Sequence, residues 1–275
     1  MMNLLEGDCL QMMPTLDAGS FDLVVTSPPY NLGIAYRSFD DTAPRADYLA
    51  WCRAWAAEIR RVMADDASFF LNVGAAPANP LMPHQLLLAL TDGPDPLFVL
   101  QNTFHWIKSI TIETRAGKTV SAGHFKPINS KRFVNDCHEY VFHLTKSGDV
   151  QLDRRGAGVP YQDKSNIARW GHTGGQDRRC RGNTWFIPYE TINSRDKDRP
   201  HPATFPVDLV RQCVLLHGKG VETRLMDPFL GIGSSAVAAK AMKLAHFTGI
   251  EIDPQYLTVA RERLEPAAEP DLFNL

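Results

Sequence analysis

Strand-like and helix-like segments alternate regularly along the last part of the chain. Short apolar runs at 223–226 and 247–252 predict strands, and each is followed by a segment with helical periodicity, at 234–243 and 255–264. A buried strand is also predicted at 21–25, where it ends at a turn. Parallel strands need a crossover connection, usually a helix, from one to the next. The alternation therefore predicts an α/β fold with a doubly wound, mostly parallel sheet.

The other predicted elements extend this pattern over most of the 275 residues. Strands are predicted at 4–8, 68–73, 98–107 and 139–144, and helices at 9–16, 47–63, 84–90 and 206–216. The helix at 47–63 places Trp51 and Trp55 on its apolar face, so both are expected in the core. A chain of this length can hold one large α/β domain with a substantial insertion.

Composition argues against several classes of protein. The chain has no apolar stretch of the ~20 residues that a membrane span needs, and its start lacks the basic and apolar regions of a signal peptide. Its five Cys are scattered, without a Cys-x-x-Cys pair, and its nine His show no ligand spacing. We therefore expect neither a disulfide framework nor a metal site, and a reducing cytoplasm as the location.

A basic middle section is hidden by the overall net charge of −2. Residues 115–199 contain 16 Lys and Arg against 9 Asp and Glu, a net charge of +7, whereas the remainder carries −9. The section is irregular and rich in Gly, and Trp170, His172 and Trp185 are interleaved with its Arg residues. A solvated loop surface can have such a charge, but Arg beside aromatic rings also suits phosphate contact and base readout. We expect an inserted basic lobe, with nucleic acid as a candidate partner.

The first of two turns that carry chemistry follows a predicted strand near the end of the chain. In Asp-Pro-Phe-Leu-Gly-Ile-Gly-Ser-Ser-Ala (227–236), Gly231 and Gly233 let the backbone approach a ligand, and Ala236 lets the next helix pack closely. Glu251 ends the next strand, where its carboxylate can accept hydrogen bonds from both hydroxyls of a ribose. The turn predicts a nucleotide-cofactor site, and its spacing leaves NAD and S-adenosylmethionine open.

The second turn is Ser27-Pro28-Pro29-Tyr30, directly after the buried strand at 21–25. Two prolines cannot continue a central ladder, so the chain must leave the sheet there, at the edge where open α/β sheets place ligands. Tyr30 offers a ring for stacking on a planar base, and Ser27 and the proline carbonyls offer acceptors for an exocyclic amino group. An amino nitrogen held through both N–H groups is oriented for attack on an electrophilic methyl.

Together the two turns resemble the motifs of the S-adenosylmethionine-dependent DNA amino-methyltransferases. Ser-Pro-Pro-Tyr precedes Asp-Pro-Phe-x-Gly-x-Gly, an order that resembles the permuted β group of this family. Further segments fall where that group has motifs: Glu6-Gly7-Asp8-Cys9, Phe104-His105-Trp106-Ile107-Lys108, His138-Glu139-Tyr140-Val141-Phe142 and His201-Pro202-Ala203-Thr204-Phe205-Pro206. The resemblance covers nearly the whole chain. It implies a seven-stranded sheet whose last strand is antiparallel, completed by strands from both ends of the chain.

The resemblance also implies roles for individual residues. The cofactor-binding set would comprise Asp8, Phe205, Asp227, Phe229, Gly231, Gly233, Ser234 and Glu251. Within it, Asp8 would accept from the adenine amino group of the cofactor, although a cap for the helix at 9–16 explains the same residue. The target base would be held by a catalytic set comprising Ser27, Pro28, Pro29 and Tyr30. We assign no chemistry to His138 and Glu139, which core hydrogen bonding would explain.

The same resemblance divides the chain and suggests its partners. Residues 1–144 and 200–275 would form the catalytic and cofactor-binding domain, and 145–199 the target-recognition segment. Contacts to DNA are expected from basic side chains, namely Lys131, Arg132, Lys164, Arg169, Arg178, Arg179 and Arg181. Double-stranded DNA is the expected partner, with a second copy of the chain and a cognate restriction endonuclease as further candidates.

Residue types in the chain narrow the choice of the base atom that accepts the methyl group. Methylation of cytosine C5 needs a thiolate nucleophile, which follows proline in that family, and none of the five Cys here does so. Ser in the first position of the turn usually accompanies N4-cytosine in the amino-methyltransferases, so we favour N4 of a cytosine flipped out of duplex DNA. N6 of adenine is the alternative, because many members of the permuted group act on adenine. Water or Ser27 would take the released proton, without a dedicated base.

Three other functions fit part of the sequence. A nicotinamide-dependent oxidoreductase would use the same glycine turn and Glu251, but it leaves Ser-Pro-Pro-Tyr unexplained. A non-catalytic DNA-binding protein would not need Ser27 and Tyr30. Methylation of RNA or of a protein amide would use a related turn, and the basic section favours nucleic acid.

Overall fold

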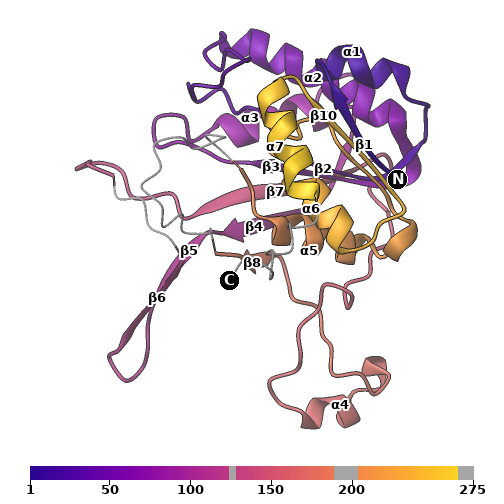
Figure 1. The fold of residues 1–275 in the computed structure, drawn as a ribbon. Helices are drawn as coiled ribbons and strands as arrows, with labels where there is room; N and C mark the ends of the chain where they lie inside the picture. The colour runs from indigo at the N-terminus through magenta and orange to yellow at the C-terminus, as the bar shows by residue number, and fades with distance from the viewer. Residues whose placement is uncertain (124–127, 189–203, 266–275) are drawn as a thin grey trace, which may run out of the picture.

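One twisted sheet organises the molecule. The computed structural model describes residues 1–123, 128–188 and 204–265. Residues 189–199 of the expected target-recognition segment, and the His201-Pro202-Ala203 part of the resemblance, lie outside this description. Eight strands form the sheet in the order β1-β10-β9-β2-β3-β7-β4-β8 (Figure 1). Their bounds are β1 Met2–Glu6, β2 Phe21–Thr26, β3 Met63–Val73, β4 Val99–Ile107, β7 His138–Thr145, β8 Thr184–Phe186, β9 Arg224–Asp227 and β10 His246–Glu251.

The mostly parallel α/β sheet expected from the sequence is confirmed, with two differences in detail. The sheet has eight strands and not seven, because the short β8 pairs in parallel with β4 at the edge. The antiparallel strand is β7, which lies between β3 and β4, whereas the last strand of the chain, β10, is parallel to both of its neighbours. No apolar run in the sequence marks β8, whose three residues are ordered by their pairing with β4.

Helices cover both faces of the sheet. Their bounds are α1 Cys9–Met12, α2 Arg45–Val62, α3 Met82–Thr91, α4 Ser165–Arg169, α5 Val207–His217, α6 Ser234–Ala241 and α7 Pro254–Leu264, with 3₁₀ turns at Met13–Thr15, Gly171–Thr173 and Gly220–Glu222. Helices α1, α2 and α3 pack on one face and α5, α6 and α7 on the other. None of the helices in the described part of the chain is both long and apolar enough to cross a membrane.

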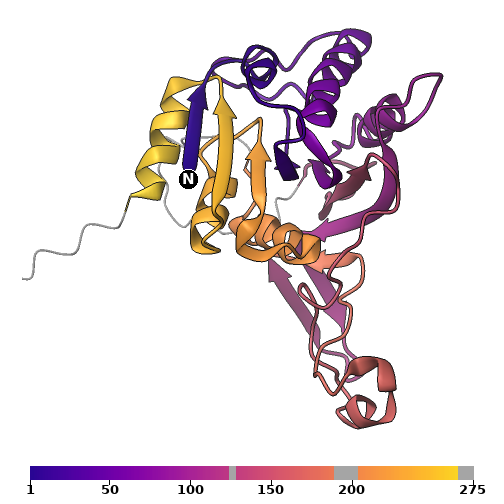
Figure 2. The same ribbon diagram turned by 90° about the vertical axis from the view of Figure 1, so that its right-hand side faces the viewer.

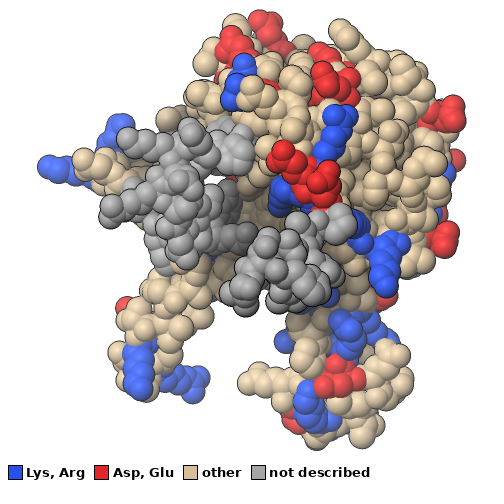
Figure 3. All heavy atoms as spheres, in the orientation of Figure 1, with Lys and Arg blue, Asp and Glu red and all other residues tan. Residues whose placement is uncertain are grey.

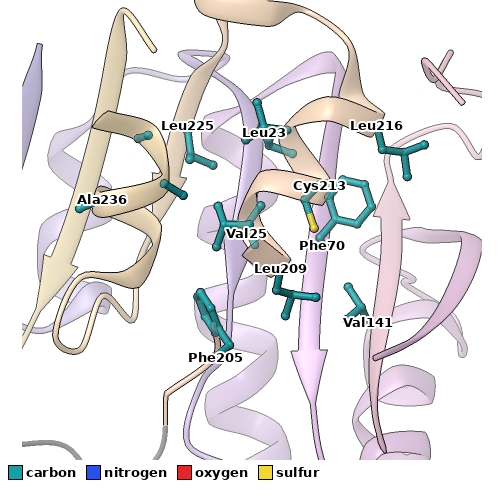
Figure 4. Packing of buried hydrophobic residues seen from close by; sticks show 14 of the residues in the cluster. Leu23, Val25, Phe70, Val141, Phe205, Leu209, Cys213, Leu216, Leu225 and Ala236 are labelled. Carbon is teal, nitrogen blue, oxygen red and sulfur yellow. The ribbon is translucent and has the colours of Figure 1, made fainter. Parts of the chain in front are cut away.

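The alternation of side chains along the central strands builds the two cores. Successive residues of a strand point to opposite faces. Leu23 and Val25 of β2 therefore pack under α5, together with Phe70 of β3, whereas Val24 packs under α2 (Figure 4). Cys213 of α5 lies at the centre of the first core and is fully buried. The cores fix β2 and β9 as neighbours in the middle of the sheet.

The two ends of the chain meet in the sheet. Strand β1 pairs in parallel with β10, so that Glu6 lies opposite Glu251, and the N–H of Gly7 donates to the Glu251 carbonyl at 2.9 Å. The expected completion of the sheet by strands from both ends is confirmed. It brings the loop that follows β1 beside the loop that follows β10, although these loops are far apart in sequence.

Two projections extend from the β4–β8 side of the sheet. One is a hairpin of β5 Ser109–Glu113 and β6 Thr119–Gly123, and the other is the lobe at 153–182 that contains α4 (Figures 1 and 2). The hairpin was not predicted, because its alternating Ile and Thr residues are exposed on a two-stranded ribbon and leave no buried apolar run. Lys and Arg side chains lie on both projections (Figure 3).

Candidate active site

A single pocket receives both of the turns that the sequence singled out. It lies at the carboxyl ends of β1, β2, β9 and β10 and has a volume of about 990 Å³ counted to its open mouth. The turn after β2 contributes Ser27, Pro28, Pro29 and Tyr30, and the turn after β9 contributes Phe229 and Gly231 among others. This is the edge at which parallel α/β sheets bind ligands.

Glu251, the acidic residue at the end of β10, is held in place at one end of the pocket by backbone hydrogen bonds. The Glu251 carboxylate accepts from the backbone N–H of Gly231 at 2.7 Å and from that of Asp253 at 2.9 Å. Burial raises the pKa of Glu251, and the two N–H donors oppose that shift. Beside it, the apolar side chain of Ile252 is 43% exposed and lines the pocket. A carboxylate next to an exposed apolar surface suits a ribose and the flat ring attached to it.

Asp8 caps a helix and also borders the pocket. Its Oδ1 accepts from the backbone N–H of Leu10 at 2.8 Å, so it caps the N-terminus of α1. It also lines the pocket, together with Gly7. Phe205 and Ser234, the remaining predicted residues outside the β9 turn, line the pocket as well.

Two of the predicted cofactor residues do not line the pocket. Asp227 is fully buried beneath the turn, where it accepts from Thr26 Oγ1 at 2.6 Å, from Ser235 Oγ at 2.5 Å and from the Phe229 N–H at 3.1 Å. Burial raises its pKa to about 6 against these three donors. Asp227 thus ties the end of β2 to the turn after β9 and acts on the pocket through the backbone.

Gly233 is required for packing. Its φ is +81°, and a Cβ there would lie 2.9 Å from the Ala260 side chain in α7. The position therefore sets how closely the turn and α6 approach α7. Gly231, with a φ of 52°, is the glycine whose backbone faces the pocket.

An aromatic wall closes another side of the pocket. Trp51 lies 5.6 Å from Phe229 and 5.0 Å from Phe39, measured between ring centroids. The prediction that both Trp51 and Trp55 belong to the core is therefore correct for Trp55, which is fully buried, whereas Trp51 is partly exposed in the pocket wall. Helical periodicity places a residue on an apolar face but does not say whether that face ends at a cavity.

The segment after Tyr30 folds over the pocket, which sequence reasoning missed. The buried Asp41 carboxylate accepts from the backbone N–H groups of Asn31, Leu32 and Ile34 and so closes the segment into a compact loop. Ser38 then donates to Asp253 at 2.9 Å. The loop is thereby attached to the start of α7 on the far side of the pocket.

The turn formed by Ser27, Pro28, Pro29 and Tyr30 is anchored on its side away from the pocket. The carbonyl of Pro29 accepts from the hydroxyl of Tyr48 in α2 at 2.8 Å, so this carbonyl is already engaged. The hydroxyls of Ser27 and Tyr30 lie 2.5 Å apart. The two prolines between them have no backbone N–H that could bind either hydroxyl instead. Burial, with the charge of Glu139 as a smaller cause, raises the pKa of Tyr30 well above its usual range, so the phenol keeps its proton.

Three polar residues behind this turn were missed by sequence reasoning. Asn72 of β3 donates to the Tyr30 hydroxyl and to Glu139 Oε2, both at 2.7 Å. Glu139 of β7 also accepts a hydrogen bond from the Tyr30 hydroxyl at 3.2 Å, and it forms an ion pair with Lys108 at 3.0 Å. Lys108 and Glu139 belong to segments of the resemblance, whereas a buried Asn inside an apolar strand was the available signal for Asn72.

The predicted DNA-contacting residues are not equivalent. Arg178 donates to the carbonyls of Gly156 and Gly158, and Arg181 donates to that of Ala157, so both support a turn inside the lobe. Lys164 pairs with Asp177. The other four are on loops or on α4: Lys131, Arg132, Arg169 and Arg179, all exposed.

Comparison with known proteins places the chain in a family. A family model described as DNA methylase, of the N6/N4 type, matches residues 21–262. The chain therefore belongs to the N6/N4 DNA methylase family. The Type II methyltransferase M.ScaI of Streptomyces caespitosus is 28% identical over 272 residues, which cover 97% of this chain and 82% of the relative. M.Cfr9I of Citrobacter freundii, also a Type II methyltransferase, is 26% identical over 95% of this chain and 87% of the relative.

Solved structures share the fold. The PvuII DNA methyltransferase, cytosine-N4-specific, has a TM-score of 0.71 at 18% identity, covering 97% of this chain and 87% of that one. M1.HpyAVI, solved as a complex with SAM, has a TM-score of 0.56 at 16% identity over 96% of this chain and 100% of that one. At these identities the likeness establishes the architecture, and the chemistry must be argued from the pocket.

Proposed function

We propose that this DNA methylase transfers a methyl group to N4 of a cytosine flipped out of double-stranded DNA. The observation that carries the proposal is the shared pocket, in which the Ser27-Pro28-Pro29-Tyr30 turn faces the turn that contains Gly231. A cofactor at one end and a base at the other would then lie within reach of each other. Family membership favours methyl transfer over the nicotinamide alternative.

S-adenosylmethionine is the cofactor, and when bound it supplies an electrophilic methyl on its sulfonium. The donor set of the pocket fits this molecule. Glu251 would hold the ribose hydroxyls, Asp8 the adenine amino group and Ile252 the face of the adenine ring. Phe229 and Phe205 add apolar and aromatic surface on the side toward the methionine part.

At the other end, the catalytic turn orients the amino group of the target base. Tyr30 would stack on the ring, and Ser27 Oγ and the Pro28 carbonyl would accept its two N–H bonds. These contacts draw the nitrogen lone pair out of conjugation and aim it at the methyl. The rate enhancement comes from positioning and transition-state hydrogen bonding. Flipping the base from its stack costs a few kcal/mol, which contacts in the pocket offset.

The choice of N4-cytosine over N6-adenine rests on Ser27. The PvuII DNA methyltransferase, which has the same architecture, supports this choice because it is described as cytosine-N4-specific. The test is mass spectrometry of nucleosides from unmethylated duplex DNA treated with the protein and S-adenosylmethionine. A peak of N4-methylcytosine is expected. A peak of N6-methyladenine alone would refute the base assignment. The absence of both peaks would refute amino-methylation of DNA.

The Ser27→Ala variant tests the role of the turn. Loss of one acceptor for the developing charge should lower kcat about tenfold or more and leave the Kd for S-adenosylmethionine unchanged. Calorimetry with the cofactor alone and a methylation assay together separate these effects. Full activity of Ser27→Ala would show that the hydroxyl has no part in catalysis.

DNA recognition is proposed for the two projections and for the loop before β7 that contains Lys131 and Arg132. The exposed Lys131, Arg132, Arg169 and Arg179 would contact phosphates or base edges, and Arg178, Arg181 and Lys164 would support the lobe that presents them. The β5–β6 hairpin carries exposed basic residues too, so we include it beside the segment at 145–199. A second copy of the chain and a cognate endonuclease are partners to be tested by light scattering and co-purification.

A further inference from the structure

We propose that Glu139 is a positioning residue that fixes the direction of the hydrogen bonds through Tyr30, so that Ser27 meets the target amino group only as an acceptor. The inference rests on the proposed amino-methyltransfer and holds for either amino base. It concerns a residue that the pocket itself does not include. Glu139 acts from behind the catalytic turn, with a side chain that is 15% exposed.

A hydroxyl such as that of Ser27 is ambiguous as a partner. It can donate its proton or accept one, and it rotates to suit its neighbours. An exocyclic amino group offers two N–H donors, so a hydroxyl whose proton pointed into the pocket would oppose it. Catalysis by this turn therefore needs a device that turns the proton of Ser27 away from the base.

Proton counting at Tyr30 supplies that device. The phenol has one proton, and the geometry gives it to Glu139 Oε2 at 3.2 Å, because the carboxylate can only accept. The contact between Tyr30 and Ser27 at 2.5 Å also needs a proton, which must then come from Ser27. The hydrogen bonds run from Ser27 to Tyr30 to Glu139. Asn72 Nδ2 lies 3.4 Å from Ser27 Oγ as a further donor, so one lone pair of Ser27 Oγ is left for the pocket.

Asn72 adds a donor to the same cluster of oxygens. Its Nδ2 donates to Tyr30 and to Glu139, both at 2.7 Å, so the phenol oxygen is an acceptor on this side as well. The reversed amide would place Oδ1 against the carboxylate. The observed orientation leaves Oδ1 buried without a partner among the described residues. An unpaired buried acceptor is unfavourable, so the carboxylate is what decides how this amide is turned.

The surroundings of Glu139 are built to keep the carboxylate in place. Its other oxygen pairs with Lys108 at 3.0 Å. Gly74, which directly follows β3, lies beside it, and a Cβ at that position would stand 3.0 Å from Glu139 Cγ and 3.2 Å from Oε1. The glycine leaves room for the carboxylate to reach Tyr30.

The same chain offers a path for the proton that the amino nitrogen loses after methylation. Ser27 Oγ takes that proton as its own moves to Tyr30, and the proton of Tyr30 moves to Glu139 Oε2. One proton leaves the nitrogen and one arrives at the carboxylate, so atoms and charge balance. The sequence-based expectation was that water or Ser27 takes this proton without a dedicated base, whereas here the proton passes on to Glu139.

The test is the Glu139→Gln variant, measured by single-turnover methylation so that product release does not mask the step. A Gln amide can donate to Tyr30 and reverse the chain, so the methyl-transfer rate should fall about tenfold, with the Kd for S-adenosylmethionine unchanged. Glu222→Gln removes the same charge at an exposed site outside the pocket and should retain the full rate. An unchanged rate in a folded Glu139→Gln protein would overturn the inference, whereas an inactive wild type would overturn only the proposed function.

A double-mutant cycle with Tyr30→Phe separates positioning from general stabilisation. If Glu139 acts through the phenol, Glu139→Gln should lower the rate by less than about twofold in the Tyr30→Phe background. Equal losses in both backgrounds would show that Glu139 acts on the fold and not on the chain of hydrogen bonds.

The Tyr30→Phe variant gives a third readout, which stays available if Glu139→Gln fails to fold. Phe keeps the ring that would stack on the base but removes the oxygen that accepts from Ser27, so the Ser27 proton can turn into the pocket. The single-turnover rate should fall about tenfold, with the Kd for S-adenosylmethionine unchanged. An unchanged rate in folded Tyr30→Phe would overturn the inference.

Discussion

The buried carboxylate of Asp227 makes the junction between the two functional turns sensitive to pH. Thr26→Val removes one of its three donors with almost no change of shape, because Val is isosteric with Thr. Both residues are fully buried, and their hydrogen bond is 2.6 Å long. A hydrogen bond to a charged group contributes about 1.5–3 kcal/mol, so we expect a loss of ~2 kcal/mol in the free energy of unfolding at pH 8. That corresponds to about 4–8 °C in Tm for a chain of this size.

The loss should depend on pH in a defined direction. The folded pKa of Asp227 is raised by burial to about 6, above the unfolded value, so the wild type loses stability as the pH rises toward that value. Without Thr26 the folded pKa rises further, and the decline continues to higher pH. The difference between wild type and variant should therefore be small at pH 5, where Asp227 is protonated in both, and largest at pH 8.

Urea unfolding at the two pH values measures this difference. The matched control is Thr223→Val, which also removes a buried threonine hydroxyl, but one that donates to the neutral carbonyl of Gly220. Its effect should be about 1 kcal/mol at both pH values. If Thr26→Val lowered the free energy of unfolding equally at pH 5 and pH 8, the view that Asp227 titrates between these two pH values in the folded protein would be refuted.

Three further outcomes are expected. Glu251→Gln should raise the Kd for S-adenosylmethionine about tenfold in calorimetry, because a charged acceptor for the ribose becomes neutral. Burial lowers the pKa of His143 to about 3 and that of His217 to about 4, so both side chains are neutral in the folded protein. Because they take up protons on unfolding, Tm should fall as the pH decreases from about 6.5 toward 4. The His217→Gln variant should show a smaller fall in Tm over this range. Arg169→Ala should weaken binding to all duplex sequences alike and reduce the salt slope by about one, as gel shifts at several salt concentrations would reveal.

Much of the site follows from local sequence. Ser27, Tyr30 and Gly231 stand in turns that directly follow predicted strands, and the carboxyl ends of parallel strands share one edge of a sheet. The shared pocket was therefore predictable from the order of elements alone. The same reasoning could not tell Asp227 from its neighbours, because a strand end does not say which side chains turn toward the pocket and which turn inward.

Hydrogen-bonding partners lay beyond sequence reasoning. Asn72 lies in β3, Glu139 lies in β7 and Lys108 directly follows β4, and only the order β3-β7-β4 in the sheet brings them together behind Tyr30. Nothing local distinguishes Glu139 from an ordinary polar residue at the start of a strand. Its importance arises from the groups that face it.

The sequence by itself determined the α/β class and the two turns at strand ends, because periodicity and turn chemistry act over a few residues. The pairing of the chain termini was expected from the resemblance alone. Tertiary structure alone decided the eighth strand, the β5–β6 hairpin, the loop latched by Ser38 and the direction of the hydrogen bonds at Ser27. These features depend on contacts between segments far apart in the chain. Such contacts form only when the whole sheet is assembled, so no local pattern records them.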